Sequence, residues 1–123
     1  MRIIIGALSG ANTGDRRAGL RRSWMGELKT REDIDGVFVG HYNAGFVRQD
    51  FSGALAAVAI PALRHVPAAR LENACATGSA AIWAALDAVG AGRMKRVLVV
   101  GLEKMNGVAG AQIGEIDRES TRL

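Results

Sequence analysis

The sequence contains a single cysteine, Cys75, among its 123 residues. One thiol can form neither an internal disulfide nor a multi-cysteine metal site, because both need at least two cysteines. We therefore predict neither a disulfide framework nor a metal centre. Whatever Cys75 does, it does without a second cysteine from this chain.

Long apolar runs are also missing. No run reaches the roughly 20 residues that a membrane-spanning helix needs, and the apolar stretch at the N-terminus is too short for a secretory signal. Hydrophobic residues make up 49% of the chain and charged residues 23%, with only 2 prolines, which is ordinary globular composition. A chain of this length allows one compact domain. We expect a cytoplasmic protein with no membrane contact.

Aromatic residues are few, at 5%, although the chain is basic, with a net charge of +4. The positive charge is concentrated near the N-terminus, in the arginine pairs 16–17 and 21–22. Surfaces that stack nucleic-acid bases interleave aromatic and basic side chains, whereas three of the six aromatics here lie in or beside apolar runs. The arginines therefore favour a solvated helix face, and no nucleic-acid partner is expected.

Three short apolar runs predict β-strands, at residues 1–8, 36–40 and 96–101. Each is rich in β-branched or aromatic residues and is bounded by glycine or charge, which is typical of strands covered on both faces in a parallel sheet. Residues 71–73 predict a weaker fourth strand.

Between these strands, the spacing of the apolar residues predicts helices. Apolar residues recur every four positions over 20–28, Ser52 could cap a helix that Pro61 ends, and residues 76–89 are apolar on nearly every side. We expect the last helix to be buried on nearly every side. Strands that alternate with helices predict an α/β fold with a mostly parallel sheet.

Cys75 lies at the predicted turn from the fourth strand into the apolar helix. The unpaired N–H groups and the dipole of a helix N-terminus favour a thiolate, and the small neighbours Ala74, Ala76 and Gly78 leave room for a substrate. These features indicate a candidate nucleophile. A free cysteine can equally be a small buried hydrophobic residue, and spacing alone leaves both interpretations open.

The residues around Cys75 resemble the nucleophile region of thiolases, in the branch related to sterol-carrier-protein thiolases. The likeness is carried by Glu-Asn-Ala-Cys-Ala-Thr-Gly-Ser-Ala-Ala at 72–81, by residues 91–105 ending in Val-Gly-Leu-Glu-Lys-Met, and by Asp-Gly-Val-Phe-Val-Gly-His-Tyr-Asn at 35–43. It is strongest over residues 33–115. The resemblance implies that residues 1–123 are a partial thiolase N-terminal domain, a three-layer α-β-α half-domain.

The resemblance also implies an activity, that of an acyl-CoA acyltransferase. The cysteine matching Cys75 would carry the acyl group during thiolytic cleavage or Claisen condensation, with its own backbone N–H as an oxyanion donor. Gly78 and Met105 would border the substrate. CoA thioesters would be substrates, with no resident cofactor, and family members are usually homodimers through the region matching 71–74.

Family members take the histidine that activates the cysteine, and a further acid/base residue, from later motifs that are not among these residues. We expect His41 and His65 to be ordinary loop or surface histidines, Glu103 to be an exposed charge or to line a site edge, and Asn73 to satisfy backbone groups in the turn. Two alternatives to the acyltransferase remain: a non-catalytic thiolase-fold fragment that only folds and self-associates, and a relative of the ketoacyl synthases.

Overall fold

The computed structural model describes residues 2–9, 31–46, 48–104 and 108–120. The helix expected over 20–28, the arginine pairs and Met105 lie outside the described residues. The strands are β1 (Arg2–Ser9), β2 (Gly36–Gly40), β3 (Ala68–Leu71) and β4 (Arg96–Glu103). The helices are α3 (Ser52–Val58), α4 (Thr77–Gly90) and α5 (Gly110–Ser120), with short 3-10 turns η1 (Ala44–Phe46), η2 (Pro61–Leu63) and η3 (Ala74–Ala76).

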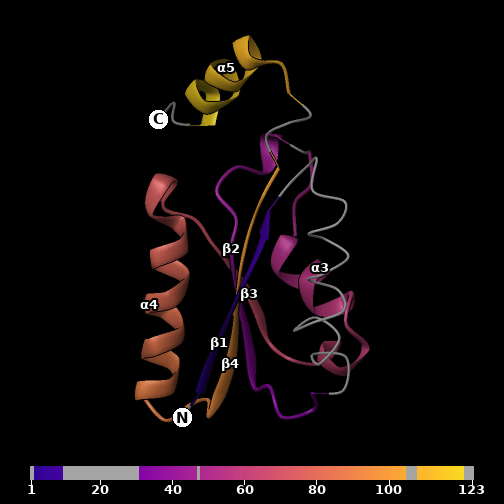
Figure 1. The fold of residues 1–123 in the computed structure, drawn as a ribbon, viewed down its shortest axis with the longest axis vertical. Helices are drawn as coiled ribbons and strands as arrows, with labels where there is room; N and C mark the ends of the chain where they lie inside the picture. Colours follow the sequence, from indigo (N-terminus) through magenta and orange to yellow (C-terminus); the bar gives the residue numbers. More distant parts are fainter. Residues whose placement is uncertain (1, 10–30, 47, 105–107, 121–123) are drawn as a thin grey trace.

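The described strands form one parallel sheet in the order β1-β4-β2-β3. The connection through α3 runs from β2 outward to β3, and the connection through α4 runs back across β2 to β4. Crossovers between parallel strands are right-handed, so two crossovers in opposite directions place their helices on opposite faces of the sheet. Figure 1 shows α3 and α4 on either side of the strands. The predicted α/β fold with three α-β-α layers is confirmed.

Two apolar layers hold the helices to the sheet, and β4 contributes residues to both. Alternate residues of a strand point to opposite faces. Val97 and Val99 therefore pack with the α4 residues Ala81, Ala85 and Val89. The opposite layer lies on the α3 side and comprises Ile34, Val37, Val39, Ala57, Leu63, Leu98 and Val100.

The fourth strand lies earlier than the sequence predicts. β3 spans Ala68–Leu71, whereas the pattern indicated residues 71–73. Asn73 (ψ 55°) and Ala74 (φ 44°) depart from extended backbone, because the chain must turn there to enter α4. The end of the strand is thus determined by the turn that follows it.

Two predictions about the helices are wrong: the cap at Ser52, and the burial of residues 76–89 on nearly every side. Ser52 is the first residue of α3 and makes no capping bond; the N-cap is Phe51, in the left-handed region with φ 58°. The α4 helix is buried on one side only, because the sheet covers the stripe that contains Ala81 and Ala85, and Trp83 is 66% exposed. Among the described residues, no helix combines the length and hydropathy needed to cross a membrane.

Candidate active site

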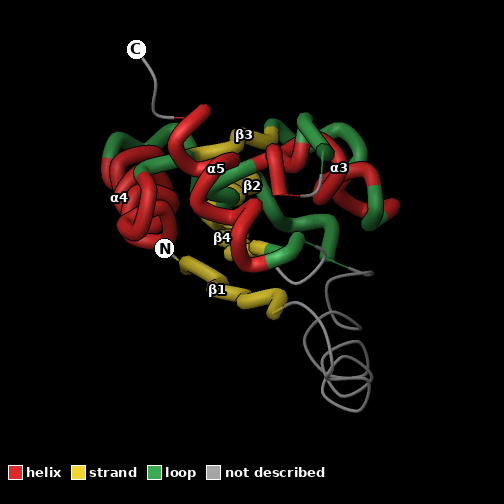
Figure 2. The backbone as a smooth tube through the Cα atoms, turned by 90° about the horizontal axis from the view of Figure 1, so that it is seen from above, coloured by secondary structure: helices red, strands yellow, loops and turns green. Residues whose placement is uncertain are grey.

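The carboxyl ends of β2, β3 and β4 meet at one edge of the sheet, because the three strands are parallel neighbours. His41 and Tyr42 follow β2, the segment 72–76 follows β3, and Glu103 is the last residue of β4. Ligands of open α/β sheets bind at this edge. Figure 2 views the sheet along its strands, with α5 also in the foreground.

The turn that carries Cys75 is a short 3-10 turn, η3, which leads directly into α4. Ala74 has φ 44°, a left-handed conformation that costs a non-glycine residue about 1–2 kcal/mol. Side chains on both sides hold this conformation. The Asn73 N–H donates to Thr77 Oγ1 at 2.8 Å, Thr77 Oγ1 donates to the Ala74 carbonyl at 2.7 Å, and the Ala74 N–H donates to Glu72 Oε1 at 3.0 Å.

The outcome of this geometry is an exposed thiol. Cys75 is exposed, so the interpretation of Cys75 as a small buried hydrophobic residue is wrong. Strained backbone that is held by surrounding bonds is characteristic of functional positions. The Asn73 side chain, expected to satisfy the turn, makes no capping hydrogen bond; Thr77 and Glu72 do so instead.

Two hollows flank the Cys75 turn, and Tyr42 lines both. The first, of about 210 Å³, is lined by Tyr42, Asn43, Ala44, Gly45, Arg70, Glu72 and Ala74. The second, of about 270 Å³, is lined by Gly40, Tyr42, Thr77, Gly78, Gly101, Leu102 and Glu103. We call them the Ala74 hollow and the Gly78 hollow. Apart from its chain neighbours and the backbone of its own helix, no heavy atom lies within 4 Å of the place where a Gly78 Cβ would be, so Gly78 leaves open space beside the turn.

His41 is not the loop or surface histidine that we expected. Its side chain is 1% exposed, and neither ring nitrogen has a hydrogen-bond partner among the described residues. Glu103 Oε1 lies 3.6 Å from His41 Nε2. Burial lowers the pKa of His41 and outweighs the opposing attraction of the Glu103 carboxylate. His65, by contrast, is exposed, as expected.

Sequence reasoning missed Arg70 and Tyr42. Arg70 Nε donates to the His41 carbonyl at 2.9 Å, and Arg70 Nη2 donates to the Tyr42 carbonyl at 2.8 Å. The Tyr42 N–H donates to Glu103 Oε2 at 3.1 Å, so Glu103 lines a site edge. Nothing in the spacing of these residues signals the contacts, because they join three strands that are distant in the sequence.

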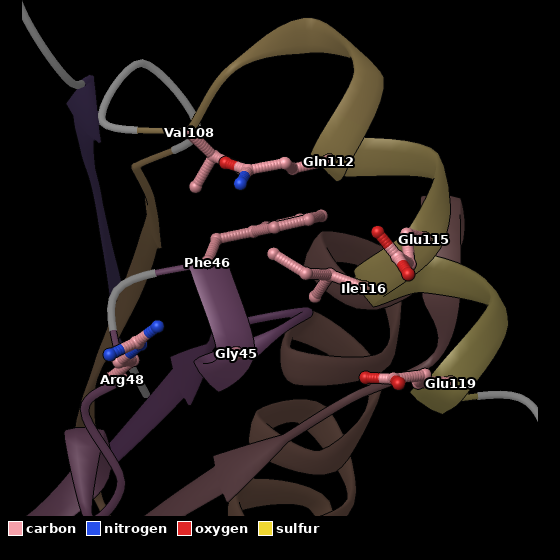
Figure 3. Close-up of a pocket in the computed structure, with 8 residues that line it drawn as sticks. All are labelled: Gly45, Phe46, Arg48, Val108, Gln112, Glu115, Ile116 and Glu119. Carbon is pink, nitrogen blue, oxygen red and sulfur yellow. The ribbon is translucent and has the colours of Figure 1, made fainter.

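The largest hollow described lies elsewhere, between η1 and α5, and measures about 520 Å³. Figure 3 shows Phe46 and Ile116 reaching into it, with Glu115 and Glu119 on α5 and Arg48 on the other side. No residue of the Cys75 turn lines this hollow. The residues next to Cys75 in the chain line only the two smaller hollows, Ala74 the first and Thr77 and Gly78 the second. No group of three or more histidine, cysteine, aspartate or glutamate side chains in the described parts of the chain is placed to hold a metal ion.

Comparison with known proteins gives a family match over nearly the whole chain. The family described as "Thiolase, N-terminal domain" matches residues 2–120. An acetyl-CoA acetyltransferase of Methanocaldococcus jannaschii is 42% identical over 81 residues, which are 65% of this chain and 20% of that relative. One from Methanothermobacter thermautotrophicus is 36% identical over 77 residues, 62% of this chain and again 20% of the relative. The chain thus spans about a fifth of the length of these relatives. No solved structure gives a significant match.

Proposed function

Since this chain belongs to the thiolase family, we propose that it carries the acyl-accepting cysteine of a thiolase-type acyl-CoA acyltransferase. One observation supports this most directly: Cys75 is exposed on a strained turn at the carboxyl edge of the sheet. The thiolase match favours this proposal over the ketoacyl-synthase alternative.

The proposed step is acyl transfer from a CoA thioester to Cys75. The Cys75 thiolate attacks the thioester carbonyl, an Sγ–C bond forms, the C–S bond to CoA breaks, and the CoA thiolate leaves. The backbone N–H of Cys75 would donate to the oxyanion of the tetrahedral intermediate. The acyl group would then pass to a carbanion derived from a second acyl-CoA, or follow the reverse course in thiolytic cleavage.

The Ala74 and Gly78 hollows support a substrate on either side of the thiol. Gly78 would border the acyl group, because a side chain at this position would fill open space beside the turn. Met105, the other residue that the resemblance places near substrate, lies outside the described residues. We propose acetyl-CoA as the probe substrate because the two relatives are named acetyl-CoA acetyltransferases.

A single-turnover experiment tests this function, because acyl transfer to Cys75 leaves a covalent adduct on the chain that its mass reveals. The folded chain is incubated with acetyl-CoA, and the intact mass is followed with time. We expect one acetyl adduct that peptide mapping places on Cys75 and that is absent from Cys75→Ser and Cys75→Ala. Circular dichroism shows that each variant is folded. A folded wild-type chain without an adduct contradicts the proposal and leaves the non-catalytic fragment.

We also propose that the chain forms a homodimer through the α3 side of the molecule. Within the described sheet, β3 has only β2 as a neighbour, so its other edge is open. Phe51, Leu55 and Val58 are 79%, 44% and 53% exposed, and their spacing of four and three places them on one side of α3. Open strand edges and exposed apolar stripes are surfaces that proteins use to associate.

Sedimentation equilibrium tests the dimer. We expect Leu55→Lys to raise its dissociation constant on the order of tenfold, because a charge replaces an apolar contact. Trp83→Lys is the matched control, since Trp83 is an exposed apolar residue on α4, at the opposite face of the sheet. A monomeric wild type, or a dimer weakened only by the Trp83 change, would exclude this interface.

A further inference from the structure

The backbone of His41 and Tyr42 is held from both sides by charged side chains. Arg70 comes from β3 on one side of β2, and Glu103 comes from β4 on the other. Arg70 donates to both carbonyls of the segment, at 2.9 and 2.8 Å, and Glu103 accepts the Tyr42 N–H at 3.1 Å. Hydrogen bonds with an ionised partner are roughly twice as strong as neutral ones. We call these three bonds the clamp.

The clamp begins where the sheet ladder ends. The last paired residues of β2 are at Gly40, opposite Leu71 on β3 and Gly101 on β4, and the His41 N–H still donates to the Leu71 carbonyl at 3.2 Å. The strands are thus aligned by backbone bonds without Arg70 or Glu103. The clamp acts on the segment that lies beyond the paired part of β2.

That segment contributes Tyr42 to the lining of both hollows beside the Cys75 turn. Tyr42 lines both the Ala74 hollow and the Gly78 hollow, Arg70 lines the first, and Glu103 lines the second. Residues on both sides of Cys75 in the chain border these hollows, Ala74 the first and Gly78 the second. The clamp therefore orders part of the lining of each hollow.

We infer that Arg70 and Glu103 are positioning residues, which hold the 41–42 segment so that a thioester in the flanking hollows is oriented for attack by Cys75. This inference rests on the proposed acyl transfer. Neither side chain needs to touch the reacting atoms. Their effect passes through the backbone of His41 and Tyr42.

Position and charge can be separated because the two side chains carry opposite charges. If they acted on the thiol by electrostatics alone, removing the Arg70 cation and removing the Glu103 anion would change its reactivity in opposite directions. If they act by position, both removals slow acetylation. Glu103→Gln separates the two causes further, because the amide oxygen can still accept the Tyr42 N–H while the charge is lost.

The experiment measures the rate of Cys75 acetylation by acetyl-CoA as a function of its concentration, by intact mass, in the full chain. We expect Arg70→Met and Glu103→Ala each to lower the limiting rate on the order of tenfold, since misplacement of a positioning group costs this much or more. Glu103→Gln should remain within about threefold of wild type, because one hydrogen bond of ordinary strength is kept. Arg93→Met, at an exposed arginine between α4 and β4, is the control and should match wild type.

Alkylation by iodoacetamide supplies a second readout, because this small reagent needs no oriented hollow. It should change by no more than about twofold in the folded variants, a difference of about 0.4 kcal/mol. Variants that acetylate at the wild-type rate, rates that move in opposite directions, or a Glu103→Gln chain as slow as Glu103→Ala would each overturn the positioning role alone. A wild-type chain that is alkylated but never acetylated would instead overturn the proposed function, and the positioning role with it.

Discussion

The helices α3 and α4 begin with similar residues, but different interactions hold their first turns in place. A non-glycine residue with positive φ comes before each helix: Phe51 at 58° directly before α3, and Ala74 at 44° three residues before α4. Each then opens with a small hydroxyl residue and a glycine, Ser52-Gly53 in α3 and Thr77-Gly78 in α4.

The α3 turn is held by close packing. A Cβ on Gly53 would lie 2.9 Å from the Arg70 backbone nitrogen and 3.0 Å from the Ala69 carbonyl carbon, whereas the buried Ser52 hydroxyl has no partner among the described residues. The α4 turn is held by hydrogen bonds through Thr77, and Gly78 faces open space. The strained residue before α3 thus leads into a tightly packed turn. The strained residue before α4 instead lies in a hydrogen-bonded turn, next to Cys75, with open space at Gly78.

The largest expected effect comes from adding one methyl group at the second residue of each helix. Gly53→Ala should lower the free energy of unfolding by about 2–3 kcal/mol, because the contacted atoms are backbone and must shift. Gly78→Ala should raise it by about 0.5–1 kcal/mol, since alanine is the better helix former and has room here. Urea unfolding monitored by circular dichroism measures both. Equal effects at the two glycines would contradict the distinction between the turns.

The hydroxyl groups give the next largest difference. Thr77→Val keeps the shape but leaves the Asn73 N–H unpaired, and should cost about 2 kcal/mol of stability. Ser52→Ala removes a buried hydroxyl without a partner and should leave the stability unchanged or raise it by up to about 1 kcal/mol. Thr77→Ser, which keeps the bonding group, should lie near wild type. A Ser52→Ala loss as large as that of Thr77→Val would show that the α3 turn also depends on its hydroxyl.

Relief of the positive φ is a smaller effect on stability, and it should change the acetylation rate only at the α4 turn. Phe51→Gly should stabilise the monomer by about 1 kcal/mol, because glycine adopts this conformation without strain and the phenyl ring is 79% exposed there. Ala74→Gly should relieve a similar strain. It should also slow the acetylation of Cys75, since glycine allows the turn more backbone conformations. Thermal unfolding and the acetylation rate are the two measurements. If Phe51→Gly slows acetylation as much as Ala74→Gly does, then the conformation of Ala74 is not specifically required for the acetylation of Cys75.

The smallest expected effect is a pH dependence that arises beside the α4 turn. Burial lowers the pKa of His41 below its ordinary value of 6.5. The unfolded chain therefore binds this proton at a higher pH than the folded chain does, and stability should fall as the pH drops below about 6.5.

Urea unfolding between pH 7.5 and 5.5 checks this dependence. His41→Gln should lessen the loss of stability over this range, whereas His65→Gln, at an exposed position, retains His41 and should show the wild-type loss. Backbone N–H bonds from Arg96 and Lys95 lower the pKa of the Asp35 carboxyl below 3.8. Its contribution to stability is therefore lost only at more acidic pH and does not interfere with this measurement. Identical pH profiles for wild type and His41→Gln would contradict a neutral buried His41.

The strands and the α4 helix were predictable because their apolar residues repeat with a local period. The Gly36–Gly40 strand has the predicted bounds, and β4 extends the predicted run by two residues. The bounds of β3 and the N-cap of α3 were not predictable, since Asn73, Ala74 and Phe51 adopt conformations that their residue types do not specify. In the candidate site, Cys75 as a candidate nucleophile followed from its position in the sequence and from the resemblance, whereas the burial of His41 and the hydrogen bonds of Arg70 did not.

The sequence by itself determined the α/β class, the order of strands and helices, and the candidate thiol, because these depend on local periodicity and on residues adjacent in the chain. Only the tertiary structure decided which groups surround that thiol. Parallel pairing brings Tyr42, Arg70 and Glu103 to one edge from three separate strands. Cys75, the one cysteine of the chain, is exposed on a turn that is held in place by hydrogen bonds with Thr77 and Glu72.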